Sequence, residues 1–332
     1  MEMLNQILKG LIRELLDQDG VNELMINGPH RIYIEKNGVM SKYDDVNKEI
    51  TYDYLAEIAN LIASHVNSII DRDSPILSAT LPTNERIEMV IPPACDKDQF
   101  VFSFRKPAAK HFTLDDYLNQ DYFEFVNKSF KKNKITEDND KLKFYIKNES
   151  WAEFFELLVS SKKNVIVAGA VGSGKTHFIN MLLSMIPHNE RIITIENARE
   201  VLMQDDDKKR NMINLLSREN VKNITEIKNS DLLKSCLRLR PDRILLSEIR
   251  GTDAFDFLNG LHVGLSGSMT SIHANNTQDV YIRLVNMLSM SEYTNGLNKQ
   301  DMLDYCKESL DVILFCEKTN GKWRMTDVDT AF

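Results

Sequence analysis

The sequence predicts an α/β protein in two parts, a smaller α+β N-terminal domain over residues 1–107 and a C-terminal α/β domain over residues 151–332. The first observation behind this prediction is length, because 332 residues are too many for one small core. The second is a set of apolar, strand-like runs after Trp151 that alternate with helical segments, as in a mostly parallel sheet. The third is that helices and strands before residue 107 do not alternate regularly, which favours a sheet with helices on one side.

The N-terminal domain is predicted to begin with an amphipathic helix over residues 3–16. Acidic residues interrupt its apolar ones, so the segment is not a signal peptide and the cytosol is the expected location. Its polar face carries few cations, Lys9 and Arg13, which favours packing on the domain core over lying on a membrane. The other predicted elements are strands at 21–27, 31–35, 86–91 and 100–104, a turn at Asn37-Gly38, and a helix marked by Leu55, Ile58, Ala59, Ile62, Val66 and Ile69.

Residues 108–150 are predicted to be a linker or surface extension, because 127–149 are polar and rich in Lys, Asn, Asp and Glu. The four cysteines have no C-x-x-C spacing and are expected to be reduced core residues, without a metal site or a disulfide framework. Three short charge runs are expected to be solvated loop charges, namely Lys131-Lys132, Asp205-Asp206-Asp207 and Lys208-Lys209-Arg210.

Four apolar runs of the C-terminal domain are predicted to form buried parallel strands, at residues 164–168, 191–195, 243–247 and 268–272. A sheet of this kind holds phosphate-binding loops at the carboxyl ends of its strands. The last apolar segments, 312–316 and 323–327, are predicted to form an antiparallel edge.

Residues 169–176 read Gly-Ala-Val-Gly-Ser-Gly-Lys-Thr and fit the phosphate-binding pattern G-x-x-x-x-G-K-[ST] at every fixed position. A strand-like run precedes them and a helical pattern follows, so backbone N–H groups are expected to hold phosphate oxygens at a helix N-terminus. Lys175 is predicted to reach the β- and γ-phosphates of ATP, and the Thr176 hydroxyl to bind Mg²⁺. The predicted nucleotide-binding residues here are Gly169, Ala170, Val171, Gly172, Ser173, Gly174, Lys175, Thr176 and His177.

Two further strands end in carboxylates that a P-loop hydrolase could use. The strand at 243–247 is followed by Glu248, with Ser247 where the usual motif has Asp, so Glu248 is predicted to act on the metal directly or through a water. The strand at 191–195 is followed by Glu196, which is predicted to polarise the attacking water, with Glu200 one helical turn further on.

A small-residue strand at 268–272 ends at His273. Neutral imidazole both donates and accepts hydrogen bonds, so His273 is predicted to sense the γ-phosphate or Glu248. Glu248, Glu196, Lys175 and His273 together are the predicted catalytic residues.

These segments resemble, in the same order, the four motifs of the traffic ATPases of secretion and pilus assembly. The motifs are the Walker A loop at 169–176, Ile195-Glu196, Leu-Ser-Glu-Ile-Arg at 246–250 and Thr-Ser-Ile-His-Ala-Asn at 270–275. The compact N-terminal domain and the absence of a four-cysteine zinc module are similar to the type IV secretion branch. Segments that match this branch are 23–28, 84–87 and 103–107.

The resemblance implies a RecA-like P-loop NTPase domain, assembly into a homohexameric ring and a nucleotide held at the interface between the two domains. It also implies that two arginines of the N-terminal domain, at the positions of Arg86 and Arg105, reach the phosphates. Two departures from the family pattern stand out. Asn197 follows Glu196 where the family has Asp, and Leu265 occupies the position of a second histidine, with His262 nearby but out of register.

The function predicted is Mg²⁺-dependent ATP hydrolysis in a hexameric ring, which the resemblance links to assembly of, or substrate translocation through, a type IV secretion system. The implied partners are other secretion ATPases and inner-membrane components, with the protein at the cytoplasmic face of that membrane. A nucleotide-gated scaffold with little hydrolysis and a pilus or type II secretion motor remain as alternatives. Stable sequence-specific binding to nucleic acid is not expected, because the net charge is −8 and no aromatic and basic strand platform is present.

Overall fold

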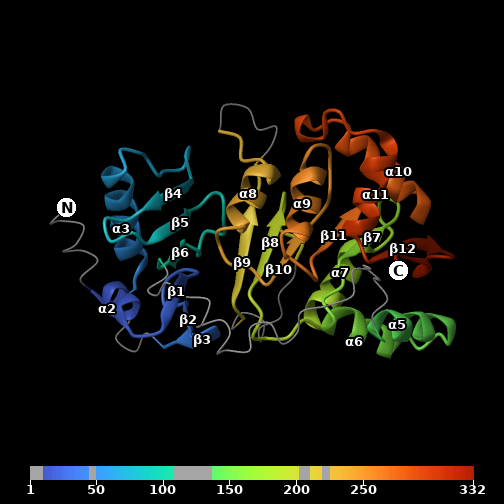
Figure 1. The fold of residues 1–332 in the computed structure, drawn as a ribbon, viewed down its shortest axis with the longest axis horizontal. Helices are drawn as coiled ribbons and strands as arrows, with labels where there is room; N and C mark the ends of the chain where they lie inside the picture. Colours follow the sequence, from blue (N-terminus) through green and yellow to red (C-terminus); the bar gives the residue numbers. More distant parts are fainter. Residues whose placement is uncertain (1–9, 45–49, 108–136, 202–209, 219–224) are drawn as a thin grey trace, which may run out of the picture.

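The structure, a computed structural model, describes residues 10–44, 50–107, 137–201, 210–218 and 225–332. These residues form two β-sheets, each packed against helices, which follow one another along the long axis of the molecule (Figure 1). The N-terminal sheet lies at the left of that view, and the C-terminal sheet fills the centre and right. The predicted α/β fold is confirmed.

Six antiparallel strands form the N-terminal sheet, in the order β3-β2-β1-β6-β5-β4. Helices α2 and α3 bury their apolar sides in the same hydrophobic cluster as this sheet. Strand β4 is absent from the sequence prediction because it is a half-exposed edge strand with small and polar residues. The element bounds are α2 Leu11–Asp17, β1 Val21–Ile26, β2 Ile32–Lys36, β3 Val39–Tyr43, α3 Tyr52–His65, β4 Ile76–Thr80, β5 Arg86–Val90 and β6 Val101–Arg105.

The helix predicted at 3–16 lies partly outside the described residues, which begin at Gly10. Its described part is α2, which places Leu11, Ile12, Leu15 and Leu16 in the N-terminal core. This part of the helix therefore packs on the domain, as its weak cationic face predicts.

The C-terminal sheet has seven strands in the order β13-β12-β7-β11-β10-β8-β9. All neighbours are parallel except β13, which pairs antiparallel with β12 at the edge. The four predicted parallel strands and the antiparallel edge are confirmed, whereas β9 was missed because it directly follows a run of charged residues. The bounds are β7 Val165–Ala168, β8 Ile192–Glu196, β9 Met212–Leu216, β10 Arg243–Leu246, β11 Met269–Ile272, β12 Val312–Thr319 and β13 Lys322–Thr330.

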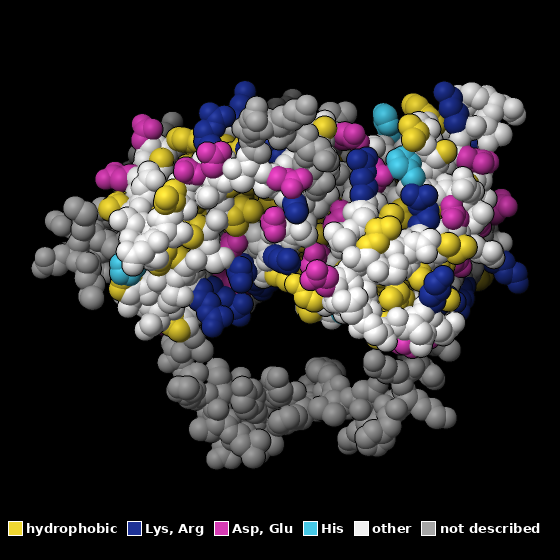
Figure 2. Space-filling view, turned by 90° about the horizontal axis from the view of Figure 1, so that it is seen from above, with side chains coloured by type: hydrophobic (Ala, Val, Ile, Leu, Met, Phe, Trp, Pro, Cys, Tyr) yellow, Lys and Arg dark blue, Asp and Glu magenta, His cyan; other side chains and the backbone are white. Residues whose placement is uncertain are grey.

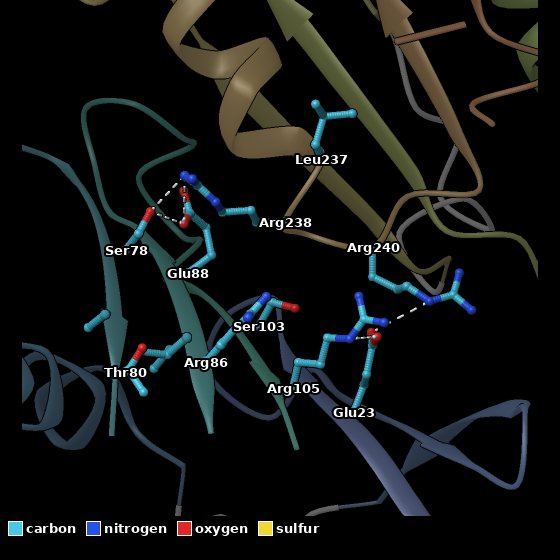
Figure 3. A pocket seen from close by; sticks show the side chains of 12 residues that line it. Glu23, Ser78, Thr80, Arg86, Glu88, Ser103, Arg105, Leu237, Arg238 and Arg240 are labelled. Carbon is cyan, nitrogen blue, oxygen red and sulfur yellow. Dashed lines mark hydrogen bonds and ion pairs between the residues drawn. The ribbon is translucent and has the colours of Figure 1, made fainter. Parts of the chain in front are cut away.

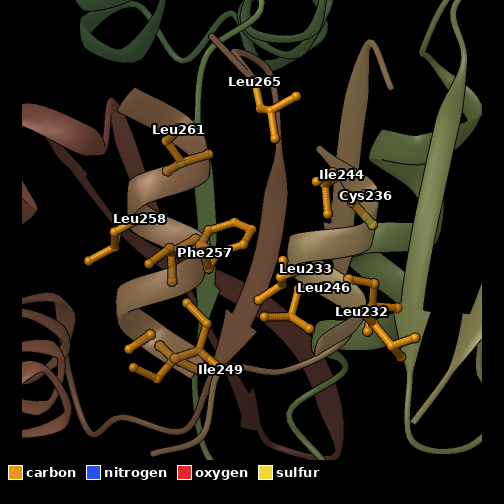
Figure 4. Close-up of a cluster of buried hydrophobic side chains, with 14 of the residues drawn as sticks. Leu232, Leu233, Cys236, Ile244, Leu246, Ile249, Phe257, Leu258, Leu261 and Leu265 are labelled. Atoms are coloured by element: carbon orange, nitrogen blue, oxygen red, sulfur yellow. The ribbon is translucent and has the colours of Figure 1, made fainter. Parts of the chain in front are cut away.

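Helices cover both faces of this sheet because its strands are apolar on both sides. Ile166 belongs to one hydrophobic cluster, with α8 to α11, while Val165 and Val167 belong to another, with α5 to α7. Figure 4 shows part of the first cluster, where side chains of α8 and α9 meet those of β10. The helix bounds are α5 Glu137–Lys147, α6 Trp151–Ser160, α7 Lys175–Ser184, α8 Asn229–Cys236, α9 Asp253–His262, α10 Thr277–Leu288, η2 Glu292–Thr294 and α11 Lys299–Ser309.

The predicted linker over 108–150 contains a helix in its described part. This helix, α5, packs on α6 and buries Leu142 completely, with Tyr145 and Ile146 partly buried beside it. Most residues of α5 are polar, and its few apolar side chains form one narrow stripe. The sequence alone therefore suggested a linker. Residues 108–136 lie outside the described residues, as do the charge runs at 131–132 and 205–207 and the first two residues of the run at 208–210. The last residue of that run, Arg210, is buried and donates to the carbonyl oxygen of Leu183 at 3.2 Å, so the prediction of a solvated loop charge is wrong for it.

The two sheets meet where the segment between β5 and β6 pairs with the edge strand β9. Cys95 and Leu215 form an antiparallel bridge, and the Asp96 amide donates to the carbonyl oxygen of Asn214 at 3.2 Å. Beside them, the guanidinium of Arg191 is fully buried and donates to the side chain of Asn27 at 2.8 Å, and burial lowers its pKa to about 10. The N-terminal sheet is therefore attached at β9. This strand forms one edge of the C-terminal sheet, and β12 and β13 lie at the opposite edge.

All four cysteines are buried, as predicted for core residues. Among the described residues, no helix combines the length and the apolar character that crossing a membrane requires.

Candidate nucleotide-binding site

Residues 169–174 form a loop between the end of β7 and the start of α7, as their glycines predict, and Lys175 and Thr176 are the first residues of α7. Gly169, Gly172 and Gly174 all have positive φ angles, of 153°, 75° and 88°. A Cβ atom at Gly169 would collide with the carbonyl oxygen of Cys316, so this position also requires glycine sterically. The loop delivers the chain to the N-terminus of α7, where the first backbone N–H groups have no partner within the helix and attract anions.

The side chain of Lys175 turns back into this loop. Its ammonium donates to the carbonyl oxygens of Gly169 and Ala170, both at 2.9 Å, and lies 3.1 Å from Nδ1 of His273. Lys175 is only 8% exposed, and burial lowers the pKa of its ammonium while the nearby Glu248 opposes that shift. The hydroxyl of Ser173 is also buried here and has no hydrogen-bond partner among the described residues. The loop therefore presents a cation and an unpaired donor at the same place, which suits a phosphate.

His273 connects Lys175 with Glu248. Because an ammonium only donates, Nδ1 of His273 must accept, and the ring proton of the neutral imidazole is then on Nε2. Nε2 lies 3.2 Å from Oε1 of Glu248, whose other oxygen accepts from Arg250 at 2.6 Å. The sheet order β7-β11-β10 explains the arrangement, since the strand that leads to His273 lies between the strands that lead to Lys175 and Glu248. Three of the predicted catalytic residues are thus brought together.

The hydroxyl of Thr176 donates to Oε2 of Glu200 at 3.0 Å. Glu200 is exposed, and it lines the same cavity as Thr176 and Glu248. Mg²⁺ in nucleotide sites is commonly held by one or two protein oxygens together with phosphates. The hydroxyl and carboxylates around this loop fit that requirement, and no group of three or more His, Cys, Asp and Glu side chains forms a separate metal cage among the described residues.

Glu196 lies where a water-activating role is hard to reconcile with its contacts. Its side chain is fully buried, and Oε1 accepts hydrogen bonds from the backbone amides of Glu200 and Val201 at 2.9 and 2.7 Å. Burial raises the pKa of this carboxyl, and the two amides partly offset the rise. The carboxylate therefore holds the turn after β8, and it is Glu200, at the end of that turn, that lines the cavity.

A cavity of about 710 Å³ surrounds the phosphate loop. It is lined by Val171 to His177, Asn197 to Glu200, Ser247, Glu248, Arg250, Ser271, His273 and Trp323. Asn197, the first departure from the family pattern, therefore lies in the cavity wall. Leu265, the second departure, is buried in the hydrophobic core against Gly260, and His262 bonds to Ser309 instead.

Arg86 and Arg105 lie outside this cavity. They line a second cavity of about 460 Å³ between β5, β6 and the segment after α8, which also contains Arg238 and Arg240 (Figure 3). Arg240 and Arg105 both face Glu23, at 3.6 Å each, and Arg105 remains 72% exposed. Figure 2 shows Lys and Arg side chains gathered beside the hollow between the two parts of the molecule. The structure thus separates the two predicted arginines from the phosphate loop of the same chain.

Sequence reasoning missed two charged or aromatic side chains of the phosphate-loop cavity. Arg199 holds Asp96 of the N-terminal part through its Nε at 2.9 Å, and Trp323 lies on the loop from the β12–β13 hairpin. Neither belongs to a sequence motif. The Asn-Gly pair at 320–321 was the available signal for Trp323, because it predicts a tight hairpin that returns the chain at that point.

Comparison with known proteins identifies the family. Residues 6–315 match the family described as "Type II/IV secretion system protein". A type IV secretion system protein, VirB11 of Bartonella quintana, is 31% identical over 326 residues, which span 96% of this chain and 90% of that protein. PtlH of Bordetella pertussis, also a type IV secretion system protein, is 29% identical over 308 residues, or 92% of this chain and 88% of that protein.

A similar solved structure is the VirB11 ATPase from the Brucella suis type IV secretion system in complex with sulphate. It matches with a TM-score of 0.89 and 30% identity, covering 98% of this chain and 94% of that chain. The resemblance to secretion ATPases predicted from the four motifs is therefore confirmed. The chain belongs to the type II/IV secretion system protein family, and in sequence and fold it is similar to the VirB11 ATPases of type IV secretion systems.

Proposed function

We propose that this chain hydrolyses ATP in the cavity around residues 169–176 and that the hydrolysis powers a type IV secretion system. The observation that carries the proposal is the connection of Lys175, His273 and Glu248 at the carboxyl ends of three adjacent strands. A P-loop hydrolase needs a cation at the phosphates, an acidic group near the metal ion and a contact through which one can respond to the other. These three residues supply that set.

The catalytic contribution of the loop is positioning and charge neutralisation. The Lys175 ammonium leaves the carbonyl oxygens of Gly169 and Ala170 and pairs with the β- and γ-phosphates, while the first N–H groups of α7 hold their oxygens. The unpaired Ser173 hydroxyl donates to a phosphate oxygen. His273 couples binding of the γ-phosphate to the position of Glu248, because its ring contacts Lys175 on one side and Glu248 on the other.

Glu200 is the residue we assign to the attacking water. It is exposed in the cavity and already accepts a hydrogen bond from Thr176. Mg²⁺, when bound, would neutralise charge on the phosphates, held by Thr176 with Glu248 directly or through a water. Glu196 keeps the turn that carries Glu200 in position, through the two backbone amides that it accepts.

The position of Arg86 and Arg105 is best accounted for by a ring of identical chains. Their cavity shares no lining residue with the phosphate-loop cavity. The N-terminal sheet is attached beside β9, which is four strand spacings from β7, or roughly 19 Å. In a homohexamer with head-to-tail contacts, the arginines of one chain would complete the phosphate site of its neighbour.

The secretion role rests on the similarity to VirB11 and PtlH, which are type IV secretion system proteins by name. The ring would drive assembly of the secretion machine, or delivery of its substrate, at the cytoplasmic face of the inner membrane. Its partners would be the other secretion ATPases and inner-membrane components. A nucleotide-gated scaffold with little hydrolysis is the second candidate, because Leu265 is a core residue where the family has a second histidine.

Phosphate release distinguishes the two candidates. Wild-type chain and a Glu248→Gln variant are incubated with ATP and Mg²⁺, and free phosphate is followed over time. An enzyme loses most of its rate in the variant, because Glu248 faces both His273 and Arg250. Equal background rates in both chains would favour the scaffold and contradict the proposed hydrolysis.

A further inference from the structure

The C-terminal hairpin extends beyond the strand that it pairs with. Strand β7 ends at Ala168, whose partner on β12 is Phe315, but β12 continues to Thr319. At about 3.3 Å per residue, the hairpin projects roughly 13 Å past the end of β7. The phosphate loop begins at the same level, so the hairpin runs alongside it.

The turn of the hairpin then directs Trp323 onto the loop. Asn320 and Gly321 have φ angles of 53° and 76°, the values of a two-residue turn that returns the chain at once. Trp323 pairs with Lys318 across the hairpin. Its indole Nε1–H donates to the carbonyl oxygen of Gly172 at 3.1 Å, which fixes the orientation of the ring.

Trp323 packs closely on two more residues of the site. Its ring stacks on the His177 imidazole, with centroids 5.2 Å apart and planes 23° apart. A Cβ atom at Gly174 would lie 3.1 Å from the indole, so the loop is narrow at this point. Despite these contacts 58% of the Trp323 surface stays exposed, and it faces the cavity of the phosphate loop.

A nucleotide held by its phosphates at the start of α7 must also accommodate its base nearby. Among the described residues that line the cavity, Trp323 carries the largest aromatic surface, and the remaining lining is mostly small, polar or charged. Bases stack on exposed aromatic rings, and each stacked base strengthens binding by about tenfold or more. The ring is fixed by its hydrogen bond and by His177, so stacking would cost little further ordering.

We propose that Trp323, held by Gly172 and His177, is the surface on which the base of the bound nucleotide stacks. The inference rests on the proposed function, since it assumes that the phosphates bind at residues 169–176. Stacking does not read the hydrogen-bonding edge of a base, so ATP and GTP are accepted alike. The larger purine rings cover more of the indole, so CTP and UTP bind more weakly.

The test compares ATP with inorganic tripolyphosphate, which has the same chain of phosphates but no base. Binding of each is measured by calorimetry with Mg²⁺ for the wild type, Trp323→Ala and Trp323→Phe, with Trp151→Phe as the matched control. Trp151 lies on α6 against Phe154, away from the cavity. Trp323→Ala is expected to weaken ATP about tenfold and to leave tripolyphosphate unchanged, and Trp323→Phe to keep most of the ATP affinity.

Equal losses for ATP and tripolyphosphate would overturn the proposal, because Trp323 would then only brace the loop. An unchanged affinity for ATP would overturn it as well. A wild-type chain that binds ATP with the expected dependence on Trp323 but hydrolyses none contradicts the proposed function and supports stacking. A wild-type chain that binds neither ligand overturns both.

A second measurement applies if Trp323→Ala fails to fold. The chain has two tryptophans, so in the Trp151→Phe variant all tryptophan emission comes from Trp323. Stacking predicts that ATP quenches this emission more than a saturating amount of tripolyphosphate does. Equal quenching by the two ligands would contradict contact between the base and the ring.

Discussion

Nε2 of His273 lies 3.2 Å from a carboxylate oxygen of Glu248, and the opposite ring nitrogen accepts from Lys175. The ring therefore contacts both the ammonium of the loop and the carboxylate that follows the neighbouring strand. Strand β11 sits between β7 and β10, so the contact follows from the order of the sheet.

Replacing His273 with alanine is expected to slow hydrolysis and leave ATP binding nearly intact. The loss should be about tenfold to a hundredfold in kcat, the effect of removing hydrogen bonds to charged groups. Phosphate release and equilibrium binding are measured side by side, with His188→Ala as control because His188 is exposed and lies outside the cavity. A His273→Ala chain with the wild-type kcat would contradict the role given to the ring.

Glu196 and Glu200 are expected to respond differently to the same substitution. Glu200→Gln should lower kcat by about a hundredfold or more, because a positioned general base contributes that much. Glu196→Gln keeps an oxygen to accept the two amides of the turn, so most of the activity should remain. Phosphate release by the two variants decides the assignment, and a larger loss in Glu196→Gln would reverse it.

Mixing two inactive chains tests whether the arginines act on a neighbour. A Lys175→Ala chain and an Arg86→Ala/Arg105→Ala chain should each hydrolyse little ATP. Mixed in equal amounts, they should regain about a quarter of the wild-type rate, since a quarter of head-to-tail interfaces join an intact loop to intact arginines. Phosphate release is measured after the chains exchange.

The control for this experiment mixes Lys175→Ala with Glu248→Gln. Both lesions lie in the phosphate-loop cavity, so their mixture cannot assemble an intact site and should stay inactive. Absence of recovery in the arginine mixture, with exchange verified by labelled chains, would show that Arg86 and Arg105 act within their own chain or have no role.

Glu88 should make stability depend on pH at the contact between the two sheets. Burial raises the pKa of this carboxyl, while hydrogen bonds from Ser235 and Ser78 partly offset the rise. A raised folded-state pKa means that protonated Glu88 favours the fold at low pH and that this contribution is lost as pH rises through the raised value. Glu88→Gln carries no charge, so its stability relative to the wild type should increase with pH.

Urea unfolding at several pH values, from the ordinary range of a glutamate near 4.3 upward, measures this difference. The free energy of unfolding of Glu88→Gln minus that of the wild type should increase across that range. A difference in free energy of unfolding that stays constant with pH would show that the substitution acts through its hydrogen bonds alone.

The sequence predicted the phosphate loop and its neighbours because their chemistry requires fixed residues at fixed spacing. Lys175, Glu248 and His273 could be placed at strand ends by the apolar runs before them, and the structure brings these three together. Glu196 has the same pattern, but its orientation depends on the turn that follows β8, which no periodicity encodes.

Other features depend on contacts that a single sequence does not reveal. Helix α5 forms because Leu142 finds a partner surface on α6, although its composition is that of a linker. The distance between Arg105 and the phosphate loop depends on the attachment of Cys95 to β9, a bridge between two irregular segments. Trp323 enters the cavity because β12 is longer than β7, and strand length is among the least predictable features.

Phosphate release by Lys175→Ala tests whether ATP is hydrolysed at residues 169–176. The ammonium of Lys175 is the one lysine charge in the lining of the phosphate-loop cavity among the described residues, and it contacts the loop carbonyls and His273. With saturating ATP and Mg²⁺ the wild type should release phosphate steadily. The rate of phosphate release by Lys175→Ala should equal the background rate measured without protein. Intact turnover in this variant would contradict hydrolysis at residues 169–176.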